Sequence, residues 1–320
     1  MSSRLEGIER TSMAGKVEIE DALKHFRGCE LEGGFATLKS VAGGLGVTPS
    51  RASEIVGVLL DQGLVESSGS LWRLTERGRG YANDVVRAHR VYETYLANET
   101  GNPSPTWHAM AEAKEHELTE DQVASMERQL GKPRFDPHGD PIPSPSGELP
   151  GSQGEALTAL GEGACGVIDH IEDEPDTVYA DLARFGLAPG MRVRITRVTP
   201  TSFEIEAEGR RLTLDRLHAA NVHLTLSADE GETLAERLSD LPLTATARIY
   251  GLSRNCRGAE RRRLLDLGIV AGNLIQAERE SPFNGPRAYR ICGTMIALRR
   301  EQAEKVFINR IRGEGFTNER

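Results

Sequence analysis

The C-terminal half of the chain contains one short pattern twice. Residues 182–190 (LARFGLAPG) and 264–272 (LLDLGIVAG) align without a gap at an offset of 82 positions, 264 minus 182. Each copy is preceded by alternating apolar residues and followed by a strand–turn–helix pattern. A repeated pattern indicates a repeated structural unit, and short strands around glycine corners are typical of small β-barrels. We therefore expect two such barrels, over residues 156–225 and 236–310.

Residues 17–80 show a different pattern, in which three short helices precede a two-stranded hairpin. The first helix is expected over residues 18–27, and the third opens with Thr48, a good N-cap residue, and Pro49, which suits the first helical turn. This order is typical of a winged helix-turn-helix, which places the N-terminal part of its third helix in the major groove of DNA. Five side chains are therefore expected to face DNA: Thr48, Ser50, Arg51, Ser53 and Glu54.

Among these five residues, Arg51 is best suited to contact a base or a phosphate. Short three-helix units also occur as protein-interaction modules, so the pattern alone leaves a protein partner open. The formal net charge of −9 argues against nonspecific coating of nucleic acid, and it is compatible with a small basic face. We expect the partner to be a double-stranded DNA operator.

Four side chains of the metal-ligand type lie at helical spacing within residues 108–116 (HAMAEAKEH). His108, Glu112, Glu115 and His116 occupy positions i, i+4, i+7 and i+8, so they share one face of a helix. The carboxylates of such a stripe repel one another unless a cation lies between them, which indicates a divalent metal ion. Imidazole and carboxylate without thiolate suit Mn(II) or Fe(II). The alternative is an ordinary solvated polar face.

A second pair of candidate ligands lies upstream of this stripe. His89 and Glu93 are four residues apart in a helix expected over residues 81–97. If the two helices face each other, together they supply six ligands. A proline-rich stretch then interrupts regular structure, so we expect a helical domain at 81–143 and a linker at 144–155.

The sequence argues against a dinucleotide site, a cysteine-based framework and a membrane span. Residues 161–166 (GEGACG) match G-x-G-x-x-G, but a dinucleotide site needs a strand before this motif and a helix after it, and here a proline-rich segment precedes and a strand pattern follows. The four cysteines are far apart and form no C-x-x-C pair, so neither a zinc ribbon nor a disulfide framework is indicated. No apolar run is long enough to span a membrane. We expect a cytoplasmic protein with no membrane partner and no small organic substrate.

Taken in order, these features resemble the diphtheria-toxin-repressor and manganese-transport-regulator family of bacterial metal-dependent transcriptional regulators. The stripe at 108–116 and the segment 136–143 (DPHGDPIP) carry the most specific part of the resemblance, and LTERGR at 74–79 supports it. The repeated modules look like FeoA domains, which the family often carries once at its C-terminus. The resemblance implies an α+β multidomain chain with four parts: a winged helix-turn-helix at 17–80, an all-α metal-binding and dimerisation domain at 81–143, and FeoA-like β-barrels at 156–225 and 236–310.

The resemblance also implies two neighbouring metal sites. The first comprises Asp21, Glu112, Glu115 and His116, and the second comprises His89, Glu93 and His108. Asp21 matches the position where manganese-type members have aspartate and iron-type members have methionine. Glu112 occupies the place of the iron-type cysteine, whereas Lys24 stands where manganese-type members carry a further carboxylate. The implied cofactor is Mn(II) or Fe(II).

The function implied by the resemblance is that of a homodimeric, metal-dependent DNA-binding regulator that represses metal-uptake genes. Metal bound between the domains would fix the two DNA-binding heads at the spacing of successive major grooves, about 34 Å. The alternative is an FeoA-like accessory protein of ferrous-iron transport, which acts through protein contacts. A metal-dependent hydrolase needs a substrate cleft that the sequence does not indicate, so we expect no enzyme activity.

Overall fold

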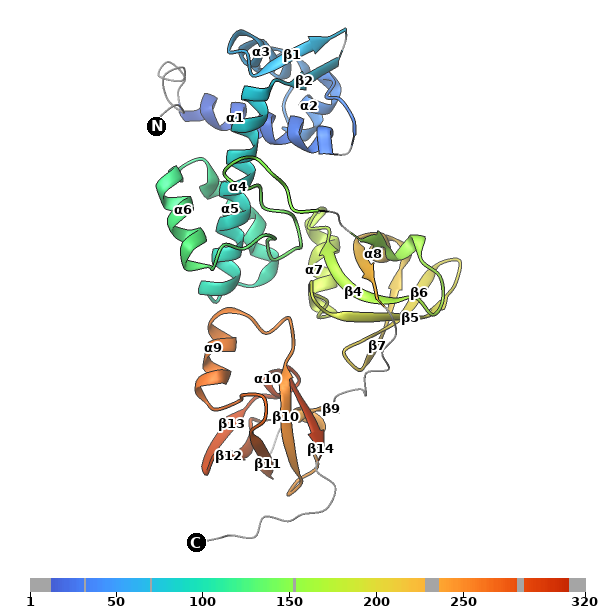
Figure 1. Cartoon of the computed structure of the whole chain (residues 1–320). Coiled ribbons are helices and arrows are strands. Elements are labelled where there is room, and N and C mark those ends of the chain that lie inside the picture. The colour runs from blue at the N-terminus through green and yellow to red at the C-terminus, as the bar shows by residue number, and fades with distance from the viewer. Residues whose placement is uncertain are drawn as a thin grey trace. The chain divides into compact units, whose positions relative to one another are not determined.

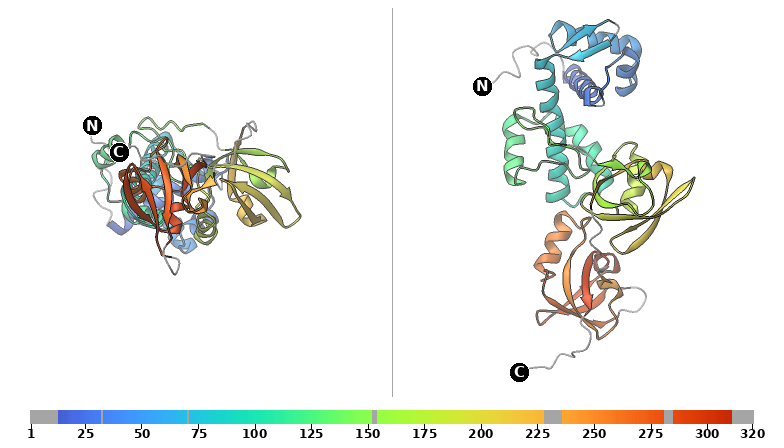
Figure 2. Two further views of the ribbon diagram at one scale, coloured as in Figure 1. Left: turned by 90° about the horizontal axis from the view of Figure 1, so that it is seen from below. Right: turned by 45° about the vertical axis from the view of Figure 1, so that its right-hand side comes forward.

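The computed structural model describes residues 13–31, 33–69, 71–151, 154–227, 236–280 and 285–310 (Figures 1 and 2). The long helices lie in the first half of the chain and the larger sheets in the second, so the chain is α+β, as expected. It forms two compact units. The N-terminal unit comprises residues 1–95, 106–136 and 140–151, and the C-terminal unit comprises residues 96–105, 137–139 and 152–320. Among the described residues, no helix combines the length and the apolar character needed to cross a membrane.

The N-terminal unit begins with three helices and a hairpin, in the expected order. These elements are α1 (Met13–Leu31), α2 (Leu38–Gly44), α3 (Pro49–Asp61), β1 (Val65–Ser68) and the antiparallel β2 (Leu71–Leu74). The Thr48 hydroxyl caps α3 by accepting the N–H of Arg51 at 3.3 Å. Helix α1 is longer than the predicted 18–27 at both ends. Its N-terminal extension contains Lys16, which donates a hydrogen bond to the carbonyl oxygen of His116 at 2.6 Å.

Helix α4 (Glu76–Glu99) begins before the predicted helix at 81–97. The Thr75 hydroxyl accepts the N–H of Gly78 at 3.0 Å and thereby caps the new helix. A Cβ added at Gly78 would lie 1.8 Å from the carbonyl oxygen of Leu64, so only glycine lets the two backbones approach this closely. The start of α4 is therefore set by a cap and a close backbone contact, which apolar periodicity does not reveal.

Two further helices complete the N-terminal unit. They are α5 (Trp107–Glu115) and α6 (Glu120–Gln129), and the short 3-10 turn η1 (Ser104–Thr106) precedes α5. In Figure 1 and in the right-hand view of Figure 2, α4 runs beside α5 and α6. Val91 of α4 and Val123 of α6 are buried in one apolar cluster. The face of α5 that carries the predicted ligands is directed toward α4 and α1.

The C-terminal unit contains two antiparallel sheets. The first is built from β3 (Glu155–Ala156), β4 (Cys165–Ile171), β5 (Arg192–Val198), β6 (Ser202–Ala207), β7 (Arg210–Asp215) and β8 (Val222–Leu226). The second is built from β9 (Glu236–Arg237), β10 (Thr246–Leu252), β11 (Leu274–Arg279), β12 (Arg287–Ile291), β13 (Thr294–Leu298) and β14 (Val306–Arg310). The short helical elements are η2 (Leu157–Ala159), α7 (Asp176–Arg184), α8 (Arg216–Ala220), η3 (Leu238–Asp240), α9 (Gly258–Asp266) and α10 (Arg300–Ala303).

The two sheets have the same strand order, which confirms that the sequence repeat is a structural repeat. The order is β3-β8-β4-β5-β6-β7 in the first sheet and β9-β14-β10-β11-β12-β13 in the second. Equivalent glycines adopt equivalent left-handed conformations: φ is 78° at Gly186 and 88° at Gly268, and it is 89° at Gly190 and 95° at Gly272. These corners require glycine, which explains why they dominate the alignment of the two copies.

Two segments that the sequence analysis singled out contain little regular structure. Residues 161–164 form a turn, and residues 165 and 166 already belong to β4, so a strand and not a helix follows the turn and the G-x-G-x-x-G match is not a dinucleotide motif. Between α6 and β3 the described residues form no helix or strand, and Phe135 pairs with Pro141 as an isolated bridge.

Candidate metal centre

Three side chains from two helices converge in what we name the first ligand group: Asp21, Glu115 and His116. Asp21 lies in α1, Glu115 is the last residue of α5, and His116 is its C-cap residue, with helical backbone angles. Nε2 of His116 lies 3.1 Å from Oδ1 of Asp21 and 3.5 Å from Oε1 of Glu115. All three candidate ligand atoms lie within 4.8 Å of one another. The contact of α1 with the end of α5 thus brings distant residues into one group.

The His116 ring is oriented by Glu20, which the sequence analysis did not identify. Nδ1 of His116 lies 2.7 Å from Oε2 of Glu20, and the hydroxyl of Tyr81 donates to the other oxygen at 2.6 Å. Glu20 is buried. A proton on Nδ1, assigned from this contact, leaves Nε2 directed at Asp21 and Glu115. Partners of this kind fix the tautomer and raise the basicity of metal-binding imidazoles.

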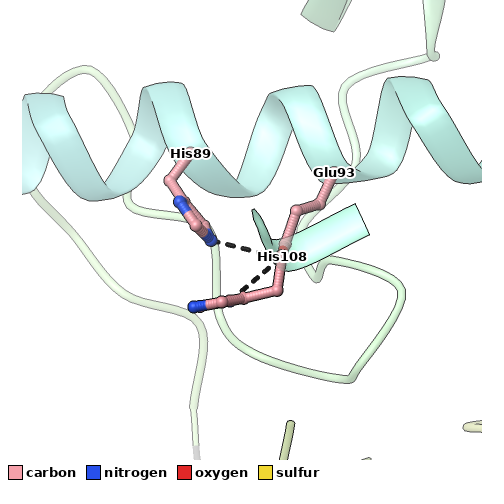
Figure 3. Close-up of side chains that lie close together, drawn as sticks. All are labelled: His89, Glu93 and His108. Carbon is pink, nitrogen blue, oxygen red and sulfur yellow. Dashed lines mark ion pairs between the residues drawn. The ribbon is translucent and has the colours of Figure 1, made fainter. Parts of the chain in front are cut away.

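The second ligand group comprises His89 and Glu93 of α4 and His108 of α5 (Figure 3). Oε1 of Glu93 lies 3.1 Å from Nε2 of His89 and 3.4 Å from Nδ1 of His108. The two rings meet edge to face, with centroids 4.8 Å apart. The i, i+4 spacing in α4 therefore does place two side chains together, and α5 supplies the third from the facing helix.

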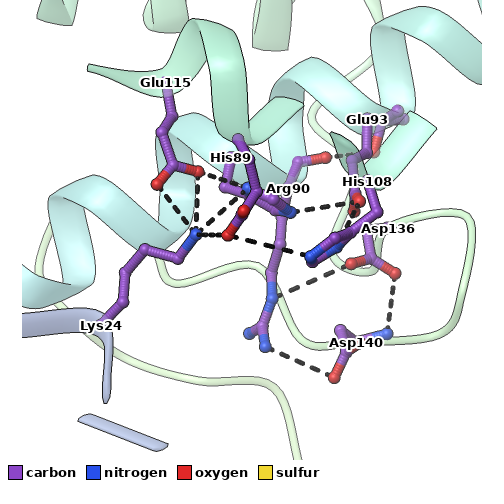
Figure 4. Close-up of polar contacts among 10 residues, drawn as sticks. Lys24, His89, Arg90, Glu93, His108, Glu115, Asp136 and Asp140 are labelled. Atoms are coloured by element: carbon purple, nitrogen blue, oxygen red, sulfur yellow. Dashed lines mark hydrogen bonds and ion pairs between the residues drawn. The ribbon is translucent and has the colours of Figure 1, made fainter. Parts of the chain in front are cut away.

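Glu115 belongs to the first ligand group and also contacts His89 of the second group; Figure 4 shows this second contact. Its Oε1 faces His116, and its Oε2 forms a short contact with Nδ1 of His89. The Nζ atom of Lys24, on α1, lies 2.8 Å from Oε1 and 3.0 Å from Oε2 of Glu115, and 3.4 Å from Nδ1 of His89. An ammonium group thus lies between the two candidate sites.

Glu112 does not join either group in the described part of the chain. Its Oε1 lies 3.2 Å from Nζ of Lys24 and 3.9 Å from Nε2 of His108. The side chain of Glu112 is 54% exposed, whereas that of Glu115 is fully buried. The role of Glu112 as a ligand, which the resemblance implies, stays a prediction.

Neighbouring imidazole and ammonium groups offset the negative charge of the carboxylates in this centre. Burial alone would lower the pKa of His116, but hydrogen bonds to Asp21 and Glu20 outweigh it and raise the pKa to about 9. Burial alone would raise the pKa of the Glu115 carboxyl, but contacts with His89 and Lys24 outweigh it and hold the pKa below its ordinary value. The metal-free centre therefore contains an ionised Glu115 carboxylate and a protonated His116 imidazole, and a bound metal ion would displace the proton of His116.

The donor atoms fit a divalent metal ion. Two atoms bound to one ion at about 2.1–2.2 Å lie at most about 4.4 Å apart, and the spread of up to 4.8 Å in each group is within reach of small side-chain rotations. Both groups combine imidazole nitrogen with carboxylate oxygen, and in the described residues neither includes a cysteine. This chemistry suits Mn(II) and Fe(II) better than a soft ion such as Cu(I).

The predicted DNA-facing residues share the outer side of α3. All are exposed: Thr48, Ser50, Arg51, Ser53 and Glu54. The opposite side of α3 is buried and consists of Ala52, Ile55, Val56 and Leu59. The exposed row is a surface that the fold of this unit leaves uncovered.

Arg51 is held by two carboxylates. Its guanidinium donates to Glu18 of α1 at 2.5 and 3.0 Å and to Glu54 at 2.6 Å. The hydrogen bond from Arg51 lowers the pKa of Glu18. Glu18 was not identified from the sequence, where nothing connects it with a residue 33 positions away. A phosphate or base that binds Arg51 must compete with these carboxylates.

Residues 75–144 match the family model for the iron dependent repressor, metal binding and dimerisation domain. Residues 156–226 and 236–310 each match the FeoA domain. The iron-dependent repressor IdeR of Mycobacterium tuberculosis (strain ATCC 25618 / H37Rv) is 30% identical over 177 residues, which cover 47% of this chain and 76% of that protein. A probable metal transport system membrane protein of Chlamydia trachomatis is 37% identical over 86 residues, and there the chain spans only 19% of the relative's length.

Solved structures of metal-dependent repressors are also similar to this chain. A manganese-dependent transcriptional repressor in complex with manganese is similar with a TM-score of 0.59 and 29% identity, over 64% of this chain and all of that one. The T. acidophilum IdeR is similar with a TM-score of 0.54 and 28% identity, over 65% of this chain and 97% of that one. The chain therefore belongs to the family of metal-dependent transcriptional repressors that includes the diphtheria toxin repressor and the manganese transport regulator, and it carries two FeoA domains.

Proposed function

We propose that this chain is a metal-dependent DNA-binding transcriptional regulator, a repressor activated by Mn(II) or Fe(II). The observation that carries the proposal is the first ligand group, because its members come from α1 and from the end of α5. A metal ion held by Asp21, Glu115 and His116 would connect α1, which packs with α3, to α5 of the predicted metal-binding part.

We assign a role to each part of the chain on this basis. Residues 17–80 form a winged helix-turn-helix that faces the operator with α3, and residues 81–143 bind metal and form the homodimer. Residues 144–155 are a linker, and residues 156–225 and 236–310 are FeoA-like barrels. Metal and operator then bind cooperatively, because metal favours the arrangement of the two heads that fits the DNA, and DNA in turn favours metal binding by the same factor.

Both Mn(II) and Fe(II) suit the ligands. IdeR is an iron-dependent repressor, and the similar solved structure is a manganese-dependent one. Asp21 offers the first group a hard oxygen, which leans toward Mn(II). The alternative function is that of an FeoA-like accessory protein of ferrous-iron transport, and the two FeoA domains support it. The similarity to metal-dependent repressors supports the function of a regulator instead.

The test is fluorescence anisotropy of the full chain on duplexes from its own and neighbouring promoters. The titrations contain Mn(II), Fe(II) under anaerobic conditions, or a chelator. We expect site-selective binding with metal only, and its loss in His116→Ala. His218→Ala is the matched control, because His218 pairs with Asp215 in the first FeoA domain. Equal binding with chelator and with metal, or metal activation that persists in His116→Ala, would overturn the proposal.

A further inference from the structure

Lys24 contacts Glu115, a member of the first ligand group, and His89, a member of the second (Figure 4). It lies on α1, three positions after Asp21, and its side chain is 19% exposed. Its ammonium contacts both oxygens of Glu115 at 2.8 and 3.0 Å, and Oε1 of Glu112 at 3.2 Å. It therefore makes the same connection, from α1 to α5, that a metal ion would make in the first ligand group.

The surroundings keep this ammonium charged. Burial alone would lower the pKa of Lys24, but the charges of Glu115 and Glu112 outweigh it and raise the pKa above its ordinary value. The Glu115 carboxylate is fully buried, so an ion pair there is shielded from solvent much more than a surface pair. Without a cation nearby, that buried carboxylate would be strongly unfavourable.

We propose that Lys24 is a tethered cation that holds Glu115 and so keeps α1 attached to α5 when no metal ion is bound. Its second effect is on the metal itself. Because Nζ already binds Oε1 of Glu115, the oxygen that faces His116, a divalent ion must share this ligand with a positive charge a few ångströms away. Lys24 therefore raises the metal concentration needed to fill the first ligand group. The inference deepens the proposed function, on which it rests for its regulatory meaning.

The test is Lys24→Met, which keeps a long side chain and removes the charge. In metal-free protein we expect faster amide hydrogen exchange in α1, because the tie to Glu115 is lost. We expect the Mn(II) affinity, measured by isothermal titration calorimetry, to increase roughly tenfold, because the metal ion no longer shares Glu115 with a positive charge. Lys24→Arg, which retains the charge, should restore slow exchange in α1.

Lys114→Met is the matched control. Lys114 lies on α5, next to Glu115 in the sequence, but its ammonium pairs with the exposed Glu117 at 2.6 Å. The substitution removes the same kind of charge from α5, the helix that carries Glu115, without touching a candidate ligand. Neither exchange in α1 nor Mn(II) affinity should therefore change. Wild-type values of both quantities in Lys24→Met would overturn the inference.

These measurements use no DNA, so they separate the inference from the proposed function. If the wild-type chain does not bind DNA with any metal, the proposed function fails while the effects of Lys24→Met on exchange and Mn(II) affinity still support the tether. If metal-dependent DNA binding is found and Lys24→Met leaves exchange and affinity unchanged, the tether alone fails. If Lys24→Met does not fold even with Mn(II), Lys24→Gln, an uncharged hydrogen-bond donor, is judged by the same two criteria.

Discussion

Replacement of Glu20 should weaken metal binding although Glu20 is not itself a member of either ligand group. The carboxylate accepts from Nδ1 of His116 at 2.7 Å and from the hydroxyl of Tyr81 at 2.6 Å, and it is buried. It therefore holds the imidazole ring with Nε2 toward Asp21. Loss of this support would leave the ring free to rotate and less basic, and both changes disfavour a bound ion.

The size of the effect follows from what each substitution removes. Glu20→Gln retains an oxygen for His116, and its amide can donate to the Tyr81 hydroxyl, so mainly the charge is lost. Glu20→Ala removes both hydrogen bonds and leaves Nδ1 without its acceptor. Changes to such supporting partners cost about 10-fold to 100-fold in metal affinity. We expect Glu20→Gln near the lower end of this range and Glu20→Ala near the upper end.

The assay is calorimetric titration of the metal-free chain with Mn(II) at constant pH. Glu117→Gln is the control, because Glu117 is adjacent to His116 in the sequence but pairs with Lys114 at the surface. The order of affinities should be wild type and Glu117→Gln together, then Glu20→Gln, then Glu20→Ala. Affinities within twofold of wild type for both Glu20 variants would refute the orienting role.

The pairing of His89 with Glu93 in the second ligand group could be predicted from spacing because it is local, whereas His108 was assigned to this group through the family resemblance. The i, i+4 spacing of His89 and Glu93 aligns both side chains on α4 whatever the rest of the fold does. His108 begins a stripe of the same kind on α5, and two amphipathic helices joined by a short connection readily face each other. The structure needs only this packing to bring the three together.

The first ligand group depends on tertiary structure that no periodicity reveals. Asp21 was connected with Glu115 and His116 only through the family resemblance, because the contact of α1 with α5 joins segments far apart in the chain. Glu20 looks like an ordinary surface glutamate, since charged residues are seldom buried unless paired. Its partner Tyr81 lies 61 positions away, so neither residue marks the other in the sequence.

In the fold as well, features set by local sequence were predicted, whereas features set by contacts between distant residues were not. The repeat at an offset of 82 positions predicted two equivalent modules, because glycine corners with positive φ restrict the residues allowed there. Helix ends were predicted less well. The N-terminus of α4 depends on the contact of Gly78 with the Leu64 carbonyl, and the N-terminal extension of α1 carries Lys16, whose partner is the distant carbonyl oxygen of His116.

Three further predictions test the DNA surface, the fold and the chemistry of the centre. Arg51→Ala should weaken operator binding by about 1–3 kcal/mol in anisotropy titrations, whereas Glu18→Gln should strengthen it by releasing Arg51; the opposite signs would contradict an Arg51 contact with DNA. Gly78→Ala should destabilise the chain by about 1–3 kcal/mol in urea unfolding, because its Cβ would meet the Leu64 carbonyl oxygen. His116 should make metal binding depend on pH. Its pKa of about 9 in the metal-free fold lies above its ordinary value of 6.5, so protonation stabilises that fold fully below about pH 6.5, and this contribution is lost as the pH rises through 9. Since a metal ion must displace the same proton, the Mn(II) affinity should rise by up to about tenfold per pH unit between pH 6.5 and 8.5, with one proton released per ion in calorimetry with buffers of different ionisation enthalpy. An affinity independent of pH over this range would mean that His116 is neutral before the metal ion arrives.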